Sequence, residues 1–342
     1  MSVSKIVFIT QRVDPAHPNL GAAAGMIRAL AARVDEVVVL ALHAERGALP
    51  ENCTVHTIGA ANRLLRGVRF GVALIPELRP TPLAVVAHMS PIYAVLAAPL
   101  CRPAGVPVLL WFTHWRDSRT LRLAERVSSA VATVDRSSFP FPSSKLVPIG
   151  HGIDVAAFPC RPVDADERLR VLALGRTSPA KGLEAVIAGV RLARARGIDV
   201  ELEIRGPSET DEERAYRRRL VELAGDGVSI EDAVQHSDVA ALFARTDLLV
   251  NAAAAGSLDK AVFEACASCL PVLASNPGFA GLLPDELMFE RGDVEQIAAR
   301  LAAFAARDAS DRAEVGHRLR HRVEAEHSTG HWAAAILELT AR

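Results

Sequence analysis

Two cations stand where an apolar strand gives way to a helix in VLALGRTSPAKGLEAVIAGV, residues 171–190. Arg176 and Lys181 lie five residues apart, in or beside the loop between those elements. A loop that leads into a helix offers unpaired backbone N–H groups and the positive end of the helix dipole, which together favour an anion. Two further positive charges would suit a diphosphate, although a solvated loop with incidental cations fits the same spacing.

A single carboxylate marks the otherwise apolar helix expected within GSLDKAVFEACASCLPVLAS, residues 256–275. A lone glutamate such as Glu264 is more often a surface or capping residue. Its neighbours are almost all apolar, however, and a carboxylate suits bidentate hydrogen bonding to a ribose diol. The helix therefore offers a second candidate contact for a nucleotide.

Two nucleotide-binding motifs that would point elsewhere are missing from the sequence. It contains no G-x-x-x-x-G-K-[ST] loop, and no G-x-G-x-x-G follows the first expected strand. The sequence therefore gives little support for a function as an ATPase or as a dinucleotide-dependent oxidoreductase. The formal net charge of −1 and the absence of a recognition-helix pattern argue against a nucleic-acid partner.

Strands and helices alternate along the chain, which predicts parallel sheets flanked by helices. The expected strands of the first half are KIVFIT, EVVVLAL, CTVHTIG, LAVVAH, PVLLWFTH and SAVATVD, and those of the second half are RVLALG, VELEIRG, VSIED, DLLVNA and PVLAS. They are continuous apolar runs, as expected when helices cover both faces of a sheet. The helix that follows the loop with the two cations is expected over 180–195.

A chain of 342 residues exceeds one ordinary core, so two Rossmann-like domains are predicted, with a hinge near residues 150–165. Ligands of open α/β sheets bind outside the carboxyl ends of the strands. Two such domains facing each other would form a cleft. The uncharged run between Arg79 and Arg102 nearly reaches the length of a membrane span, but its prolines split it into a strand and a helix.

At this point the chain resembles the retaining family 4 glycosyltransferases of the GT-B fold. The matching pieces are GRTSPAKG, RTDLLVNAAAAGSLDKAVFEACASCLPVLAS, GHGIDVAAF and LWFTH. The resemblance implies an N-terminal acceptor-binding domain over 1–155, a nucleotide-sugar-binding domain over 165–328, and a C-terminal helix, 329–342, that crosses back to the first domain.

The resemblance also implies roles for particular residues. Arg176 and Lys181 match the pair that holds the donor diphosphate, and Glu264 matches the second glutamate of the E-x7-E motif, which binds ribose. His114 matches the active-site histidine near the donor sugar. Gly21 falls where the family has a glycine-rich loop near the diphosphate.

One position departs from the family pattern. The first glutamate of the motif would fall at Gly256, so a carboxylate that usually contacts the donor sugar is absent there. Ser257, Asp259, Lys260 or backbone amides would have to substitute, or catalysis would be impaired. The segment VSIEDAVQHSD, which contains Val234, would line the base by resemblance.

The cysteines and the N-terminus suggest a reducing compartment. Five scattered cysteines do not indicate a disulfide framework. Cys266 and Cys269 have C-x-x-C spacing without a second pair to complete a zinc site, so we predict buried structural thiols. MSVSKIVFIT is typical of a first strand rather than a signal peptide. A cytoplasmic protein is expected, with peripheral contact to the inner membrane face as an option.

Together these features predict a metal-independent retaining glycosyltransferase without a cofactor. It would move a hexose, with mannose as a guess, from a nucleotide diphosphate sugar to a hydroxyl of a glycolipid, a polysaccharide precursor or a small-molecule glycoside. Arg63, Arg66 and Arg69 recur at helical spacing between apolar residues, which suits either an anionic membrane surface or an ordinary basic face. A non-catalytic or degenerate GT-B binding subunit is the alternative.

Overall fold

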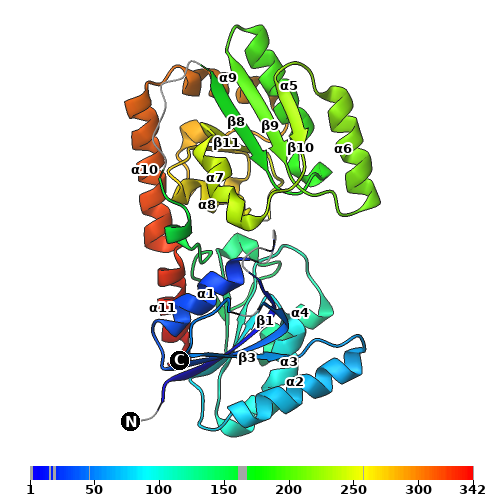
Figure 1. Ribbon diagram of the computed structural model, residues 1–342, viewed down its shortest axis with the longest axis vertical. Coiled ribbons are helices and arrows are strands. Elements are labelled where there is room, and N and C mark those ends of the chain that lie inside the picture. Colours follow the sequence, from blue (N-terminus) through cyan, green and yellow to red (C-terminus); the bar gives the residue numbers. More distant parts are fainter. Residues whose placement is uncertain are drawn as a thin grey trace. The chain divides into compact units, whose positions relative to one another are not determined.

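The computed structural model describes residues 3–14, 17, 21–45, 47–160, 168–256 and 258–341. Its internal contacts divide the chain into two compact units, one of residues 1–154 with 326–342 and one of residues 155–325 (Figure 1). Each unit contains one sheet whose paired strands are all parallel. The prediction of an α/β chain with two parallel sheets is therefore confirmed.

The sheet of the first unit has the strand order β3-β2-β1-β4-β5-β6-β7. Its strands are β1 (Lys5–Val13), β2 (Glu36–Ala44), β3 (Cys53–Thr57), β4 (Ala84–His88), β5 (Val108–Trp111), β6 (Ala130–Thr133) and β7 (Leu146–Pro148). The first six correspond to predicted strands. The three-residue β7 was not predicted, because so short a segment has no periodicity to detect.

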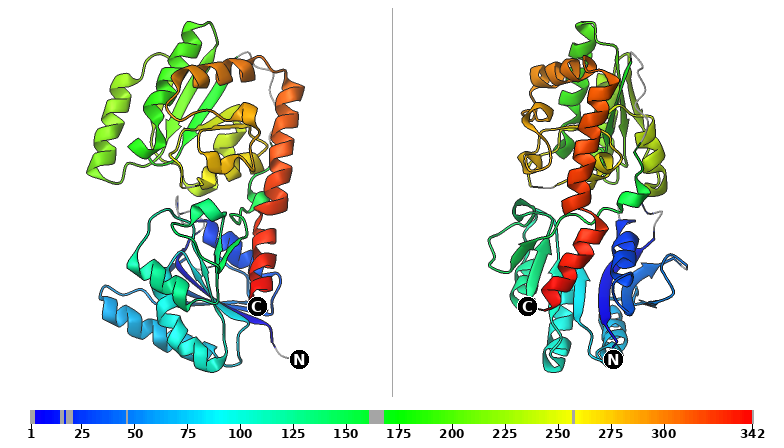
Figure 2. Two further views of the ribbon diagram at one scale, coloured as in Figure 1. Left: turned by 180° about the vertical axis from the view of Figure 1, so that it is seen from behind. Right: turned by 90° about the vertical axis from the view of Figure 1, so that its left-hand side faces the viewer.

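Helices cover both faces of this sheet, which explains its continuous apolar strands. They are α1 (Ala22–Ala31), α2 (Arg63–Glu77), α3 (Pro91–Cys101), α4 (Arg119–Val127) and α11 (Thr329–Thr340). Val7 and Ile9 share a core with α2, α3 and α4. Phe8 points to the other face, where its ring meets the buried Trp332 of α11 edge to face, and α11 packs beside α1 (Figure 2).

The sheet of the second unit has the strand order β10-β9-β8-β11-β12. Its strands are β8 (Leu169–Leu174), β9 (Val200–Arg205), β10 (Val228–Glu231), β11 (Leu248–Asn251) and β12 (Val272–Ala274). Its helices are α5 (Leu183–Ala195), α6 (Asp211–Leu223), α7 (Val239–Ala244), α8 (Lys260–Ala267), α9 (Val294–Ala305) and α10 (Ala309–Glu326). All five predicted strands are present.

The strand order fixes where a ligand can bind in this unit. The chain winds outward from β8 to β9 and β10, then returns to β11 on the other side of β8. The loops that follow β8 and β11 therefore leave the sheet in opposite directions and open a crevice at its carboxyl edge. The loop after β8 carries Arg176 and Lys181.

The run between Arg79 and Arg102 forms β4 and α3, as predicted. No helix among the described residues is both long enough and apolar enough to cross a bilayer.

The prediction for the C-x-x-C cysteines is wrong for one of them. Cys269 forms a disulfide with Cys160, 109 residues earlier in the chain. Cys266 is a buried free thiol, and burial raises its pKa. The bond escaped the sequence analysis because residues so far apart meet only once the fold has brought the chain segment before β8 to the end of α8.

Candidate functional site

A small pocket lies at the carboxyl ends of β8 and β11, at the point where the strand order reverses. Backbone and side chains from both strands and from the loop after β8 form its walls. The residues that line it are Ala173, Leu174, Gly175, Arg176, Lys181, Leu183, Val250, Asn251 and Ala252. The structure thus places both predicted phosphate-binding cations at the edge of the sheet where α/β proteins bind ligands.

The loop after β8 turns tightly before its helix begins. Pro179–Lys181 form a 3-10 turn, and Gly182 adopts a left-handed conformation with φ of +60°. A side chain at Gly182 would meet the Ala252 carbonyl oxygen at 2.7 Å. Helix α5 therefore starts at Leu183, three residues later than expected. This turn brings the Lys181 side chain back over the end of the strand, beside Gly175.

Lys181 is already paired with a carboxylate of the same unit. Its Nζ lies 2.6 Å and 2.5 Å from the two carboxylate oxygens of Asp259, which stands directly before α8. Asn251, at the end of β11, donates a hydrogen bond to Asp259 at 2.7 Å. Both side chains of the ion pair are largely buried, at 20% and 13% exposure. The structure therefore brings together two residues of the predicted site from separate loops.

Arg176 is more exposed than Lys181 and has looser partners. Its guanidinium lies 3.5 Å from Glu213 and 4.0 Å from Glu209, and 52% of its side chain is accessible. Glu213 also takes part in the capping box that starts α6. An arginine held this loosely can turn toward an anion at small energetic cost.

Glu264 is a buried carboxylate on α8 with two polar partners. Its Oε1 lies 2.7 Å from His236 Nε2 and 3.0 Å from Lys260 Nζ. Burial acts to raise the pKa of Glu264, but the charge of Lys260 and the hydrogen bond from His236 outweigh it and lower the pKa to about 2. The group is therefore ionised at neutral pH, the form that accepts hydrogen bonds from hydroxyl groups.

Two residues of this region were missed by the sequence analysis. His236 lies in the segment VSIEDAVQHSD, two positions after Val234. A lone histidine in that segment gave no indication that it would contact Glu264. Arg291 donates hydrogen bonds to the carbonyl oxygens of Ala252 and Pro179, on the two loops that flank the pocket. No local pattern marks Arg291, because its partners lie far away in the sequence.

The other predicted residues of the second unit give less information. Val234 is half-buried in the loop between β10 and α7. Ser257 lies outside the described residues. Gly256 has a left-handed φ of +97°, a conformation that a glutamate side chain would strongly disfavour.

His114 and Gly21 belong to the first unit. His114 follows β5, its Nδ1 accepts a hydrogen bond from the Arg116 amide at 3.0 Å, and its ring stacks on Trp115. Gly21 precedes α1 with an ordinary right-handed conformation, so its φ does not require glycine. His88, at the end of β4, is buried between Phe8 and Trp111 rings, and burial lowers its pKa to about 3.

One group of potential metal ligands comes together in the described part of the chain, namely Cys160, Cys269 and His317. The group lies just after the C-terminal end of α8, whereas Lys260 lies at the N-terminal end of that helix. Because the two sulfurs are bonded to each other, they are not available as thiolates in this state. The predicted site residues are not part of this group.

Comparisons with known proteins match a family over part of the chain and a fold over all of it. Residues 168–307 match the family model described as glycosyl transferases group 1. A comparison of the sequence with curated proteins finds no significant match.

Solved structures resemble the chain over its whole length. Sucrose-phosphate synthase from Thermosynechococcus elongatus is 17% identical with a TM-score of 0.72, covering 99% of this chain and 98% of its own. A glycosyltransferase from Rickettsia africae is 13% identical with a TM-score of 0.74 and coverages of 99% and 98%. Anabaena HepE in complex with UDP-glucose is 16% identical with a TM-score of 0.73 and coverages of 98% and 99%. Residues 168–307 therefore match the group 1 glycosyl transferases, and the chain as a whole has the GT-B fold of these solved structures.

Proposed function

We propose that this protein is a retaining glycosyltransferase that moves a hexose, of mannose type, from a nucleotide diphosphate sugar to an acceptor hydroxyl. The observation that carries the proposal is the placement of Lys181 and Arg176 at the carboxyl ends of β8 and β11. The family match of residues 168–307 and the UDP-glucose bound by HepE support the donor class. The acceptor would be a glycolipid, a polysaccharide precursor or a small-molecule glycoside.

In this proposal the two cations act on the leaving group. As the bond to the sugar breaks, negative charge grows on the diphosphate, and positive groups fixed beside it lower the barrier. Lys181 would exchange its Asp259 partner for the phosphates, while Asn251 continues to hold the released carboxylate. Asp259 would then face the donor sugar and replace the carboxylate that Gly256 lacks.

The remaining residues bind the nucleoside and the sugar. The ionised Glu264 would accept hydrogen bonds from the ribose hydroxyls, and the Val234 segment would line the base. His114 would contact the donor sugar. For retention at the anomeric carbon, the acceptor hydroxyl attacks the donor sugar from the same face as the leaving phosphate. The hydroxyl gives its proton to that phosphate. We propose that no metal ion is needed, because the cations take over charge neutralisation of the diphosphate.

A second candidate function is a non-catalytic GT-B binding subunit. Two observations favour it: Gly256 replaces a family carboxylate in a conformation suited to glycine, and Lys181 is already neutralised by Asp259. Such a subunit would keep the fold without turning over a donor.

The test that separates the two is a thermal-shift titration with UDP, GDP and ADP, carried out with and without EDTA. A nucleotide at about 100 times its Kd stabilises the protein by roughly 2.7 kcal/mol. We expect one nucleotide to raise the Tm, the shift to vanish in Arg176→Ala, and the shift to persist in Arg218→Ala, which removes an exposed arginine from α6. No shift with any nucleotide would favour the non-catalytic subunit, and a shift abolished by EDTA would contradict metal independence.

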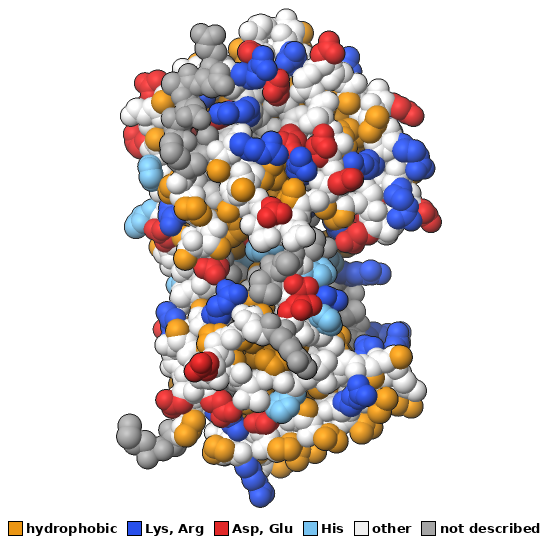
Figure 3. All heavy atoms as spheres, in the orientation of Figure 1, with side chains coloured by type: hydrophobic (Ala, Val, Ile, Leu, Met, Phe, Trp, Pro, Cys, Tyr) orange, Lys and Arg blue, Asp and Glu red, His pale blue; other side chains and the backbone are white. Residues whose placement is uncertain are grey.

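Helix α2 offers a surface for a membrane-bound acceptor. Its outward face carries Leu64, Leu65, Val68, Val72 and Ile75, which are 47–81% exposed. At 100° per residue these five side chains fall within one stripe, while Phe70 and Leu74 point into the core. Orange side chains gather along the lower edge of the molecule in Figure 3, where Figure 1 shows α2.

The charge around this stripe suits anionic lipid. Helix α2 contains three arginines, Arg63, Arg66 and Arg69, and one carboxylate, Glu77. Arginines that flank an exposed apolar stripe are typical of helices that lie in the membrane interface. We propose that α2 docks on an anionic bilayer and brings the first unit to a lipid-linked acceptor.

Vesicle flotation tests this docking. We expect the protein to float with phosphatidylglycerol-containing vesicles and the double variant Val68→Asp/Val72→Asp to stay at the bottom. Each valine buried in the bilayer contributes about 1.5 kcal/mol, or roughly tenfold in partitioning. Val221→Asp, which changes a valine of similar exposure on α6, is the matched control and should float like wild type. Wild-type protein that remains with the unbound fraction would rule out the membrane role.

A further inference from the structure

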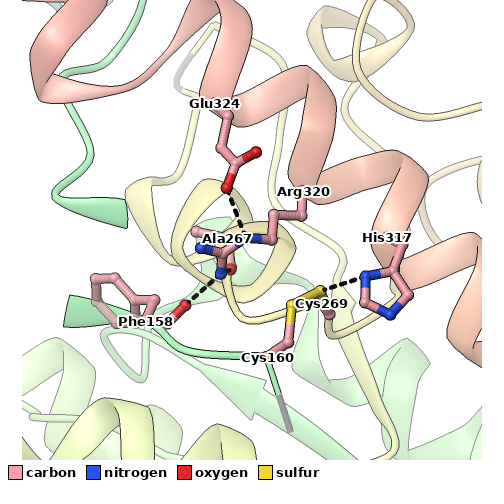
Figure 4. Close-up of a disulfide and its surroundings, with 7 residues drawn as sticks. All are labelled: Phe158, Cys160, Ala267, Cys269, His317, Arg320 and Glu324. Atoms are coloured by element: carbon pink, nitrogen blue, oxygen red, sulfur yellow. Dashed lines mark hydrogen bonds and ion pairs between the residues drawn. A yellow bond between two sulfur atoms is a disulfide. The ribbon is translucent and has the colours of Figure 1, made fainter. Parts of the chain in front are cut away.

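A disulfide ties the start of the second unit to the end of α8. Cys160 is the last residue of the segment 155–160, with which the second unit begins. Cys269 lies two residues after α8 ends (Figure 4). We propose that Cys160–Cys269 is a reversible redox modification site, and that its reduction weakens nucleotide binding. The second half of this proposal rests on the proposed function.

The bond lies in a junction that α10 helps to hold. Arg320 of α10 donates hydrogen bonds to the carbonyl oxygens of Phe158 and Ala267, which belong to the two segments that the disulfide joins. Glu324 in turn accepts a hydrogen bond from Arg320 at 2.7 Å. Gly316 lets α10 approach closely, since a Cβ there would lie 2.1 Å from the Cys269 carbonyl oxygen. The disulfide and the hydrogen bond from Arg320 thus join the segment 155–160 to the end of α8 and to α10.

The surroundings of the disulfide suit thiol exchange. Cys160 is half-buried, whereas Cys269 is 5% exposed, so Cys160 is the more accessible of the two cysteines to a thiolate from solvent. His317 is exposed, and its Nδ1 lies 3.4 Å from the Cys269 sulfur. The imidazole is therefore placed to form a hydrogen bond with the Cys269 sulfur when that sulfur leaves as a thiolate.

The exchange needs a thiol reductant such as a low-molecular-weight thiol. Its thiolate attacks the Cys160 sulfur, the Cys160–Cys269 bond breaks, and Cys269 departs with the electron pair and gains a proton. A second thiolate then attacks the reductant sulfur of the mixed disulfide and releases Cys160. Two electrons and two protons enter the protein, and the reductant leaves as its own disulfide.

Contacts lead from the disulfide to the proposed ribose carboxylate. The Phe158 ring, two residues before Cys160, meets the rings of His236 and Phe243 with centroids 6.0 Å and 6.2 Å apart. His236 is bound to Glu264 at 2.7 Å. Glu264 and Cys269 also lie only five residues apart, at α8 and just beyond it. Reduction would release the segment that carries Phe158 and so loosen the packing behind His236.

A permanent zinc site fits these residues less well. The group provides two cysteines and one histidine, one ligand short of a closed tetrahedral site. The cationic Arg320 lies beside it, joined to the same segments.

The first experiment counts thiols and uses no nucleotide. Native protein equilibrated in glutathione buffers of graded potential is alkylated and weighed by mass spectrometry. We expect Cys160 and Cys269 to become alkylated together as the buffer becomes reducing, and both to remain unlabelled in samples that are reoxidised before alkylation. Cys53→Ser, which removes a half-buried free thiol, should titrate like wild type apart from one fewer label. A pair that stays oxidised or stays reduced throughout, or that co-purifies with stoichiometric zinc, would overturn the modification site.

The second experiment measures coupling to the nucleotide site. The Kd for whichever of UDP, GDP and ADP gives the largest thermal shift is determined for oxidised and reduced wild type and for Cys160→Ser. We expect the Kd to rise about fivefold or more on reduction, within the usual range of allosteric coupling. Cys160→Ser should resemble the reduced form and not respond to redox potential. Equal Kd values in all three would refute the coupling while leaving the proposed function intact, whereas no binding in any form would refute both.

Discussion

Replacing Lys181 with alanine is expected to lower kcat for sugar transfer about 10²- to 10³-fold, the usual effect of removing one fixed donor from a developing negative charge. The reason is geometric. The ammonium group lies at the carboxyl ends of β8 and β11 and is largely buried, so it is held in place and poorly screened by water. Steady-state kinetics with the nucleotide sugar identified by thermal shift provide the measurement.

Variants around Lys181 separate charge from structure. Lys181→Arg keeps the charge and should retain more activity than Lys181→Ala. Asp259→Asn tests the carboxylate that holds Lys181: loss of activity would support its contact with the donor sugar. Arg218→Ala controls for loss of a cation at an exposed position of the same unit. Similar kcat values for wild type, Lys181→Ala and Arg176→Ala would remove the proposed mechanism.

The second large effect concerns Glu264 and is visible without any substrate. The ordinary pKa of 4.5 falls to about 2 in the folded protein, so the folded state favours the ionised form. That difference corresponds to about 3 kcal/mol of stability. The contribution is fully present above pH 4.5 and is lost as the pH falls from 4.5 toward 2, where the carboxylate becomes protonated in both states.

Glu264→Gln keeps the shape of the side chain and removes its charge. We expect this variant to unfold about 3 kcal/mol more easily than wild type in urea at pH 7, and the gap to narrow steadily below pH 4.5. Glu222→Gln, which changes an exposed carboxylate of α6, should show neither effect. A gap that stays constant down to pH 3 would mean that the ion pair with Lys260 and His236 does not stabilise the fold.

Local patterns were sufficient to predict most elements of the fold. Continuous apolar runs such as VVVL of β2 and LLVN of β11 indicate strands that helices cover on both faces. The prolines between Arg79 and Arg102 indicate a break between a strand and a helix, and α3 begins at Pro91. The start of α5 was misplaced, because a 3-10 turn and a left-handed glycine have no apolar periodicity to reveal them.

The sequence by itself determined the class of most elements, the alternation that makes both sheets parallel, and the presence of two cations where a strand meets a helix. These properties depend on the hydrophobicity and spacing of residues that lie within one or two turns of each other in the sequence. Only the tertiary structure decided the partners: Asp259 for Lys181, His236 for Glu264 and Cys160 for Cys269, at separations of 78, 28 and 109 residues. Such pairs form because the winding of the sheet brings distant loops to one edge, and no local pattern encodes which side chains will meet there.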